Sequence, residues 1–220
     1  MLQNAPVQRT DAQKDLGILV CKDLKWTCRV LEAASKANRM LGFIRRSTLE
    51  VKIQSTRTAL YKALVMSNLS YSSQVWAPQS VKLIEIIEKV QRRATKYILS
   101  LPYRTDISYK ERLRLTELIS LCYWHEYLDL VYTYKSIVNN TDIQFKISRP
   151  LRVTRRTASS KGVLLDIPKT KTVTFQNSFY SRASRTFNTL PEYLRDNTQS
   201  INVFKTKLKK KIRRSNFNCV

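Results

Sequence analysis

Glycine, proline and histidine are scarce in this chain, whose 220 residues contain three glycines, six prolines and one histidine. Sheet-rich folds need many turns, and turns use glycine and proline, so this scarcity favours helices. No apolar run approaches the ~20 residues that a membrane-spanning helix needs. The first residues are polar and do not resemble a signal peptide. We therefore expect a mainly α protein that has no membrane partner.

Acidic residues are also few, with sixteen Asp and Glu against forty Lys and Arg. A polymerase, nuclease or phosphotransferase groups carboxylates to hold Mg²⁺, whereas the acids here are scattered along the chain. There is no Walker loop, no GxSxG and no HExxH motif. A serine triad would have to use His125, which lies in a helical pattern among aromatic residues and is better explained by packing. We expect no enzymatic activity from this chain alone, no cofactor and no small-molecule substrate.

The four cysteines, at positions 21, 28, 122 and 219, show no CxxC spacing. This pattern matches neither a zinc module nor a secreted disulfide framework. Cys122 and His125 are one helical turn apart, but two ligands do not make a metal site, and core packing is the simpler role. We expect no metal and an intracellular location, nuclear or cytoplasmic.

Positive charge is the most prominent feature that the sequence does have. The formal net charge is +24 and the sequence pI is about 10.2. Solubility alone needs a net charge of only roughly 2–8 in a small domain. A surplus this large suits phosphate, because neutralising phosphates releases condensed counterions. Acidic membrane is the rival partner, but the lack of an apolar run of membrane length argues against it, and solubility alone is the remaining explanation.

Three basic zones carry the candidate contacts: a helix flank at 89–96, the segment 149–161 with 182–185, and the tail 205–214. The tail has seven Lys or Arg and no acid. It suits phosphate contact or nuclear import, and the alternative is a solvated end. The candidate nucleic-acid-binding residues are Lys89, Arg92, Arg93, Lys96, Arg152, Arg155, Arg156, Arg182, Arg185, Lys209, Lys210 and Lys211.

The pattern of apolar residues divides the chain into five segments. They are a loose leader at 1–14, a β-hairpin at 15–27 with its turn at Lys22-Asp23, a helical domain at 28–140, an extended basic segment at 141–174, and C-terminal helices with a basic tail at 175–214. The pattern thus predicts a helical bundle with a short hairpin in front and a helical pair behind.

Local signals predict where helices begin and which way side chains point. Capping boxes at 47–50 and 108–111 predict helix starts, Ser80 is a plausible N-cap, and a break is expected near 119–120. We expect Trp76 to set the angle between the helices on either side of it. The remaining expectations concern facing: Leu60, Ala63, Leu64, Phe179, Ala183 and Phe187 inward, and Arg57, Lys62, Arg182 and Arg185 outward.

Several motifs in a fixed order resemble the end of the polymerase region of LINE-type (non-LTR) retrotransposon reverse transcriptases. The match covers roughly residues 14–208. The motifs are Asp15-Leu-Gly-Ile-Leu-Val, Asp23-Leu-Lys-Trp26, Lys36-Ala-Asn-Arg-Met-Leu-Gly42, Leu60-Tyr-Lys-Ala-Leu-Val65, Gln74-Val-Trp-Ala-Pro78, Glu88-Lys-Val-Gln-Arg-Arg-Ala-Thr-Lys96, Tyr109-Lys-Glu-Arg-Leu113, Asn177-Ser-Phe-Tyr-Ser-Arg182 and Phe187-Asn-Thr-Leu-Pro191. Each motif is weak alone, but their common order is specific.

The resemblance implies a thumb-like helical bundle whose catalytic carboxylates lie upstream in the palm. It implies that Lys89, Arg92, Arg93 and Lys96 grip the backbone of the template–primer duplex. The implied partners are RNA or an RNA–DNA hybrid, and the upstream palm and fingers of the same element. The alternatives are a domesticated helical adaptor that binds proteins with the same surfaces, and a residual enzyme.

Overall fold

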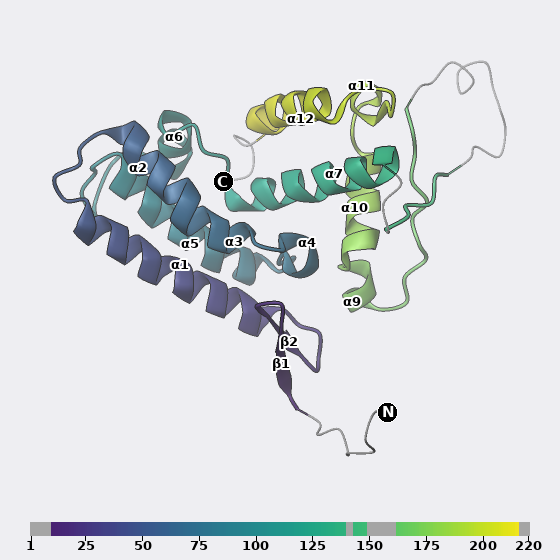
Figure 1. The fold of residues 1–220 in the computed structure, drawn as a ribbon, viewed down its shortest axis with the longest axis horizontal. Helices are drawn as coiled ribbons and strands as arrows, with labels where there is room; N and C mark the ends of the chain where they lie inside the picture. Colours follow the sequence, from purple (N-terminus) through teal and green to yellow (C-terminus); the bar gives the residue numbers. More distant parts are fainter. Residues whose placement is uncertain (1–9, 140–142, 149–161, 216–220) are drawn as a thin grey trace, which may run out of the picture.

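The computed structural model describes residues 10–139, 143–148 and 162–215, and this part of the chain is mainly helical, as expected. In the first part the elements are β1 Ala12–Asp15, β2 Ile18–Cys21, α1 Thr27–Ser47, α2 Gln54–Leu60, the π-helix η1 Tyr61–Met66, α3 Ser67–Ser70, α4 Ser73–Trp76, α5 Val81–Ile98 and α6 Tyr109–Leu115. In the second part they are α7 Leu121–Asn139, α9 Val173–Gln176, α10 Phe179–Asn188, α11 Glu192–Arg195 and α12 Ile201–Ser215. Figure 1 shows α1–α6 at one end of the molecule and α9–α12 at the other, with α7 reaching between them.

The N-terminal hairpin forms, but its turn is not where the sequence pattern placed it. Strands β1 and β2 pair antiparallel from Ala12 opposite Cys21 to Asp15 opposite Ile18. The turn is therefore Leu16-Gly17, with positive φ angles of 43° and 81°, and the expected turn at Lys22-Asp23 is wrong. Two consecutive positive φ angles match the right-handed twist of a hairpin, and glycine adopts one of them without steric cost. Three residues of the expected loose leader are thus part of a strand.

Helix α1 runs on to Ser47, so the expected helix start at 47–50 is wrong. The Thr48 hydroxyl donates to the Ile44 carbonyl and lies 2.6 Å from the Tyr97 hydroxyl. It therefore closes the end of α1 against α5 and caps no new helix. Helix α2 begins six residues later, at Gln54.

A π-helical segment changes which residues of the second helical rod face the core. The rod is continuous from α2 through η1 to α3, and a π turn adds a residue, which rotates the following face. Its buried residues are Arg57, Tyr61, Val65, Met66 and Leu69. Of the expected core residues, Leu64 is half-buried and packs against the first core, Leu60 is only half-buried, and Ala63 is exposed, so the prediction is wrong for Ala63.

Arg57 was expected to face outward and is buried instead. Its Nη1 donates to the Tyr97 carbonyl (2.8 Å) and to the Ser100 hydroxyl (2.6 Å), and its Nε donates to the Val51 carbonyl (2.6 Å). Carbonyls in the last turn of a helix have no partner within the helix. Arg57 provides a hydrogen-bond donor for the last turn of α5, and this hydrogen bond explains why the guanidinium is buried.

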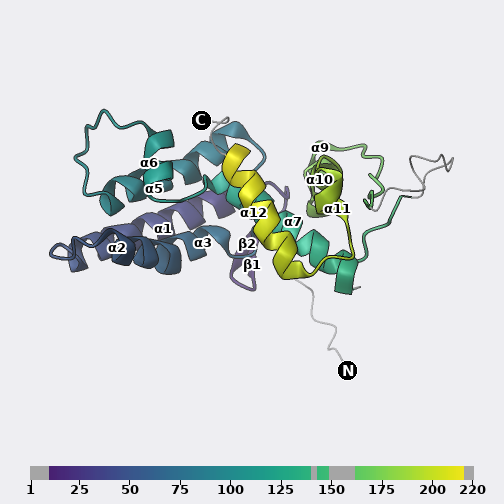
Figure 2. The same ribbon diagram turned by 90° about the horizontal axis from the view of Figure 1, so that it is seen from above.

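Two hydrophobic cores hold the elements together. The first joins the hairpin, α1, η1, α3, α4, α5 and α6, with Trp76 and Tyr61 among its largest buried side chains. The second joins α7, α10, α11 and α12 around Tyr134, Phe187 and Phe204. Around the break that the sequence predicted, Leu118 and Leu121 belong to the first core and Ile119 belongs to the second. Helix α7, expected within one helical domain, packs mainly in the second core and also contacts α4 and α5 (Figure 2).

Trp76 takes up a central position in the first core. Its side chain is 0% exposed, and its indole nitrogen donates to the Tyr71 carbonyl (2.8 Å). The ring meets His125 of α7 edge-on, with 5.5 Å between centroids, and the Arg29 guanidinium lies 5.2 Å from its centroid. Trp76 thus joins α4 to both α1 and α7.

The described parts of the expected extended segment contain isolated bridges rather than strands. Ile147 pairs with Leu165, and Gly162 pairs with Asp196, both antiparallel. The Asn188 side-chain amide oxygen accepts from the Leu165 N–H and its nitrogen donates to the Leu165 carbonyl, at 2.8 Å each. This segment therefore lies along α10 and the chain that follows it.

Candidate nucleic-acid interface

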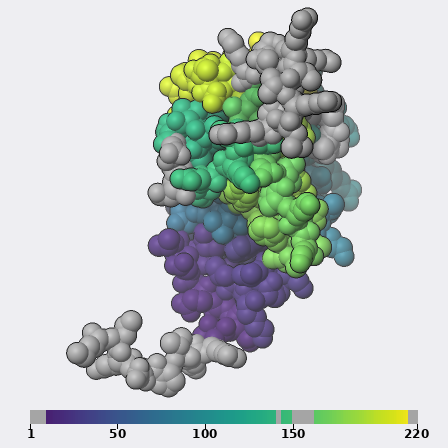
Figure 3. Space-filling model, turned by 90° about the vertical axis from the view of Figure 1, so that its right-hand side faces the viewer, coloured from purple at the N-terminus to yellow at the C-terminus, as the bar shows by residue number. Residues whose placement is uncertain are grey.

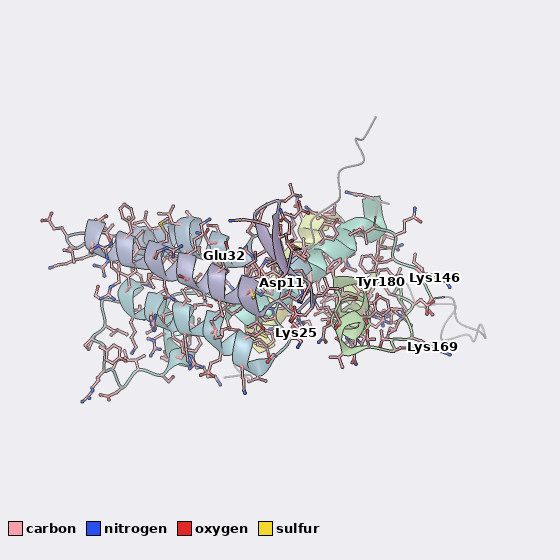
Figure 4. The ribbon with its side chains drawn as sticks, turned by 90° about the horizontal axis from the view of Figure 1, so that it is seen from below. Asp11, Lys25, Glu32, Lys146, Lys169 and Tyr180 are labelled. Atoms are coloured by element: carbon pink, nitrogen blue, oxygen red, sulfur yellow. The ribbon has the colours of Figure 1, made fainter. Side chains whose placement is uncertain are left out.

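The expected basic flank of α5 exists, but its cations are engaged within the chain. Lys89 is exposed and forms an ion pair with Glu85 one turn earlier (3.6 Å). Arg93 is exposed on the same face and donates to the Asn38 side chain of α1 (3.1 Å). Helices α1 and α5 run side by side in Figure 4, and the hydrogen bond between Arg93 and Asn38 joins the two helices.

The other two cations of the flank are half-buried against tyrosines. The Arg92 guanidinium lies 5.2 Å from the ring centroid of Tyr109. The Lys96 ammonium lies 4.9 Å from the ring of Tyr103 and donates to the carbonyl of the same residue. A cation over an aromatic face gains electrostatic attraction from the ring. A phosphate at this flank must compete with these contacts.

Glu88 makes a contact that its spacing did not reveal. Glu88 lies four residues before Arg92, a spacing that favours a helical ion pair, but its carboxylate is buried. It accepts from the Tyr109 hydroxyl (2.6 Å) and from the backbone N–H of Cys122 (3.0 Å), in the first turn of α7. Burial raises the pKa of Glu88, and these hydrogen bonds oppose that rise. Glu88 therefore joins three helices and does not face solvent.

Arg182 was a candidate phosphate contact, and the structure contradicts its outward placement. Its side chain is buried, and its Nε donates to Asp129 Oδ2 of α7 (2.8 Å). Its other nitrogens donate to the carbonyls of Gln74 (2.6 Å) and Asn177 (3.0 Å). The guanidinium therefore joins α7, α4 and the chain just before α10. The sequence could not show this, because two of its partners lie 53 and 108 residues away.

Arg185, on the same helix, is half-buried, and its guanidinium donates to the carbonyls of Ser181 and Gln176. Only part of the Arg185 side chain is therefore exposed to solvent. Arg152, Arg155 and Arg156 lie outside the described residues.

A cluster of titratable side chains surrounds the Arg182 ion pair. Burial raises the pKa of Asp129 to about 6, although the Arg182 guanidinium opposes the rise. Burial lowers the pKa of His125 to about 4, while its hydrogen bond to the Leu69 carbonyl (2.7 Å) acts in the opposite direction. The core-packing role expected for His125 is confirmed. Within the described ranges, no group of three or more His, Cys, Asp or Glu side chains is placed to hold a metal ion.

Helix α12 carries an accessible basic surface. Phe204, Leu208 and Ile212 recur at steps of four and are buried against the second core. This spacing turns the remaining residues of the helix toward solvent. The exposed cations are Lys207, Lys209, Lys210, Arg213 and Arg214, and Lys205 and Lys211 are half-buried at the sides. We call this surface the α12 basic face.

The cations of the α12 basic face are mostly free of acidic partners. Among the described residues, only Arg213 of this face forms an ion pair, with Glu117 at 3.6 Å. Two shallow depressions on the face share Lys210 and Arg214, and one of them also includes the exposed ring of Tyr193. Clustered like charges without counter-charges repel one another, so this face favours a polyanion.

The sequence named only Lys209, Lys210 and Lys211 as site residues on this helix. The four-residue spacing of Phe204, Leu208 and Ile212 could have added Lys207, Arg213 and Arg214. No sequence signal identified Tyr193, which reaches the face from α11.

Of the basic zones, the α5 flank and the α12 basic face lie on helices that pack mainly in different cores. In Figure 1, α12 lies across the top of α7, whereas α1 and the hairpin lie at the opposite side of the molecule. Helix α5 packs on α1 in the first core, and α12 packs on α7 in the second. The flank of α5 and the α12 basic face are therefore two separate candidate contacts.

Comparisons of the chain with protein-family models, with curated proteins and with solved structures found no match. Among the helices of the described residues, none is both long enough and apolar enough to cross a membrane.

Proposed function

We propose that this chain binds the phosphate backbone of RNA or of an RNA–DNA hybrid, as the non-catalytic C-terminal part of a LINE-type reverse transcriptase. The observation that carries the proposal is the α12 basic face, on which several cations are exposed without acidic partners among the described residues. The assignment to this kind of polymerase rests on the ordered sequence motifs. In that setting the upstream palm and fingers are further partners.

Backbone contact is the mode of binding that fits this surface. Lysine-rich faces neutralise phosphates and release counterions, which gives affinity without sequence readout. Sequence-specific recognition of RNA instead uses unstacked bases that are hydrogen-bonded on their edges. The α12 basic face presents almost only ammonium and guanidinium groups. Binding therefore has little sequence preference and depends strongly on salt.

The α5 flank has a secondary role in this proposal. Its cations already contact Glu85, Asn38, Tyr103 and Tyr109, so binding phosphate there costs existing contacts. Lys89, which is exposed, and Arg93 can add contacts once α12 is engaged.

Charge reversal on α12 tests the proposal. The double variant Lys209→Glu with Lys210→Glu should weaken binding of an RNA–DNA hybrid by tenfold or more, because two cations are replaced by repelling charges. The slope of log affinity against log salt should become shallower by about 0.9 for each phosphate that the variant no longer neutralises. Fluorescence anisotropy with a labelled hybrid over a salt series measures both effects.

The matched control is Lys169→Glu with Lys171→Glu, two exposed residues before α9 that undergo the same change of charge. This control should change affinity only slightly. A parallel variant, Lys89→Glu with Arg93→Glu, measures the contribution of α5. Equal reductions in the α12 variant and in the control would show that binding follows net charge alone and would contradict the proposed site.

A further inference from the structure

A groove of about 1010 Å³ lies between the two cores. One wall comes from the segment between β2 and α1 and from the chain around α4, and the other comes from α7 and the start of α10. Figure 3 shows the α9–α10 segment beside the N-terminal part of the molecule, and Figure 4 places Lys25 near the gap between the start of α1 and α10. The hairpin and the α12 basic face lie outside the groove.

The walls of the groove are mainly apolar and are open to solvent. Five of the lining side chains are large, apolar and each more than a third exposed: Leu24, Val75, Tyr132, Ile143 and Val173. Soluble monomers seldom expose large neighbouring apolar side chains, and such patches mark binding surfaces. A groove of this size and character suits the apolar face of a peptide.

The charged residues of the groove indicate the charge of the peptide. Lys25 and Lys82 are the charged side chains among the described lining residues, and both are exposed. No ion pair of either lysine occurs within the part of the chain that the structure describes. A partner with carboxylates beside its apolar side chains matches both lysines, whereas a basic partner is repelled.

The aromatic rings of the groove are not arranged to stack a nucleobase. Phe179 meets Tyr132 edge-on, with 5.5 Å between centroids, and also meets Phe145 edge-on. The Arg182 guanidinium lies 5.7 Å from the Phe179 ring, and Trp26 packs against the first core. Base stacking needs an accessible aromatic face. The groove therefore favours aliphatic side chains over bases.

We propose that this groove binds an acidic amphipathic segment of a partner protein. The apolar side chains of the segment would lie between Leu24, Val75 and Val173, and its carboxylates would meet Lys25 and Lys82. This binding is independent of the α12 basic face, so the chain holds a protein partner and nucleic acid at separate surfaces.

The test uses the full chain and three short amphipathic helical peptides with one apolar face in common. Their polar faces carry Glu, Gln or Lys. The labelled Glu peptide should bind at moderate salt, with the Gln peptide weaker and the Lys peptide weakest. Val75→Asp and Val173→Asp should each reduce affinity for the Glu peptide tenfold or more. Both positions are exposed, and circular dichroism checks that each variant is folded.

Lys209→Gln is the matched control, because it also lowers the net charge by one but lies on the α12 basic face. An equal reduction of Glu-peptide binding in this control and in Val75→Asp would show general charge attraction and overturn the proposal. Two other results would also overturn it: a concentration-dependent dimer that Val75→Asp abolishes, or single-stranded RNA binding that Val75→Asp abolishes while peptide binding persists. Hybrid binding by Val75→Asp should stay unchanged, which separates failure here from failure of the proposed nucleic-acid site.

Discussion

Arginine and lysine have different roles in this protein. Arg29, Arg57, Arg112 and Arg182 are buried and donate to carbonyls, carboxylates or hydroxyls, or lie over aromatic rings. A guanidinium has five donors in a planar fork, so it can satisfy several carbonyls from distant elements at once. The single ammonium group of lysine lacks this planar fork and is less suited to satisfying several distant carbonyls at once. Within the described chain, the surface available to phosphate is accordingly dominated by lysine.

The Arg182–Asp129 ion pair should be a main determinant of stability. Arg182→Ala leaves the Asp129 carboxyl buried without its cation and removes a donor from three backbone carbonyls, so the free energy of unfolding should fall by about 3–5 kcal/mol. Urea denaturation measures this. In the variant the pKa of Asp129 should rise above its value of about 6, because the opposing guanidinium is gone.

Arg185→Ala is the control for this prediction, since Arg185 is half-buried and has no carboxylate partner in the described structure. Its cost should stay below about 1 kcal/mol. A destabilisation in Arg182→Ala no larger than in Arg185→Ala would show that the ion pair contributes little. A double-mutant cycle with Asp129→Asn isolates the coupling between the two side chains.

A local capping signal sets the start of a helix in this chain only where no tertiary contact at the same residues replaces it. Ser108 caps α6, with the serine hydroxyl accepting from Glu111 N–H (3.2 Å). The similar spacing at 47–50 does not cap, because α1 continues through Ser47 and Thr48 contacts Tyr97. The π segment η1 likewise turns Tyr61 into the core, where it is fully buried. The outcome at each site depends on what packs against it.

Two serines allow this difference to be measured. Ser108→Ala removes a hydrogen bond to an N-terminal N–H of α6 and should cost about 1 kcal/mol of unfolding free energy. Ser80 stands at the same position before α5, but its side chain makes no capping hydrogen bond. Ser80→Ala should therefore cost only a few tenths of a kcal/mol. Equal costs, measured by urea denaturation, would contradict the assignment of the cap.

The molecule as a whole joins two cores and carries a large positive charge. Helix α7 links the cores because Trp76 and Glu88 meet its first half, whereas Tyr134 packs with Phe204 in its second half. Net charge far from zero destabilises a compact state through self-repulsion. Stability and nucleic-acid affinity should therefore respond to salt in opposite directions.

Raising sodium chloride from about 0.05 to about 0.5 M should increase the free energy of unfolding, because the Debye length shortens severalfold and repulsion is screened. The same change should weaken hybrid binding. Urea is the suitable denaturant, since it is uncharged. The variant Lys209→Glu with Lys210→Glu should gain less stability from salt, because it has less repulsion to screen. A stability that falls as salt rises would contradict this account.

The sequence by itself determined the helical class, the apolar side of α12, the break before α7 and the positive charge. Each of these follows from composition or from residues close together in the chain, whose spacing sets a face or a cap. Only the tertiary structure decided that Arg57 and Arg182 point inward, that Glu88 meets Tyr109, and that a groove separates the two cores. The partners of these side chains lie tens of residues away, so their burial depends on how whole elements pack. For the same reason the α12 basic face replaced the flank of α5 as the stronger candidate site.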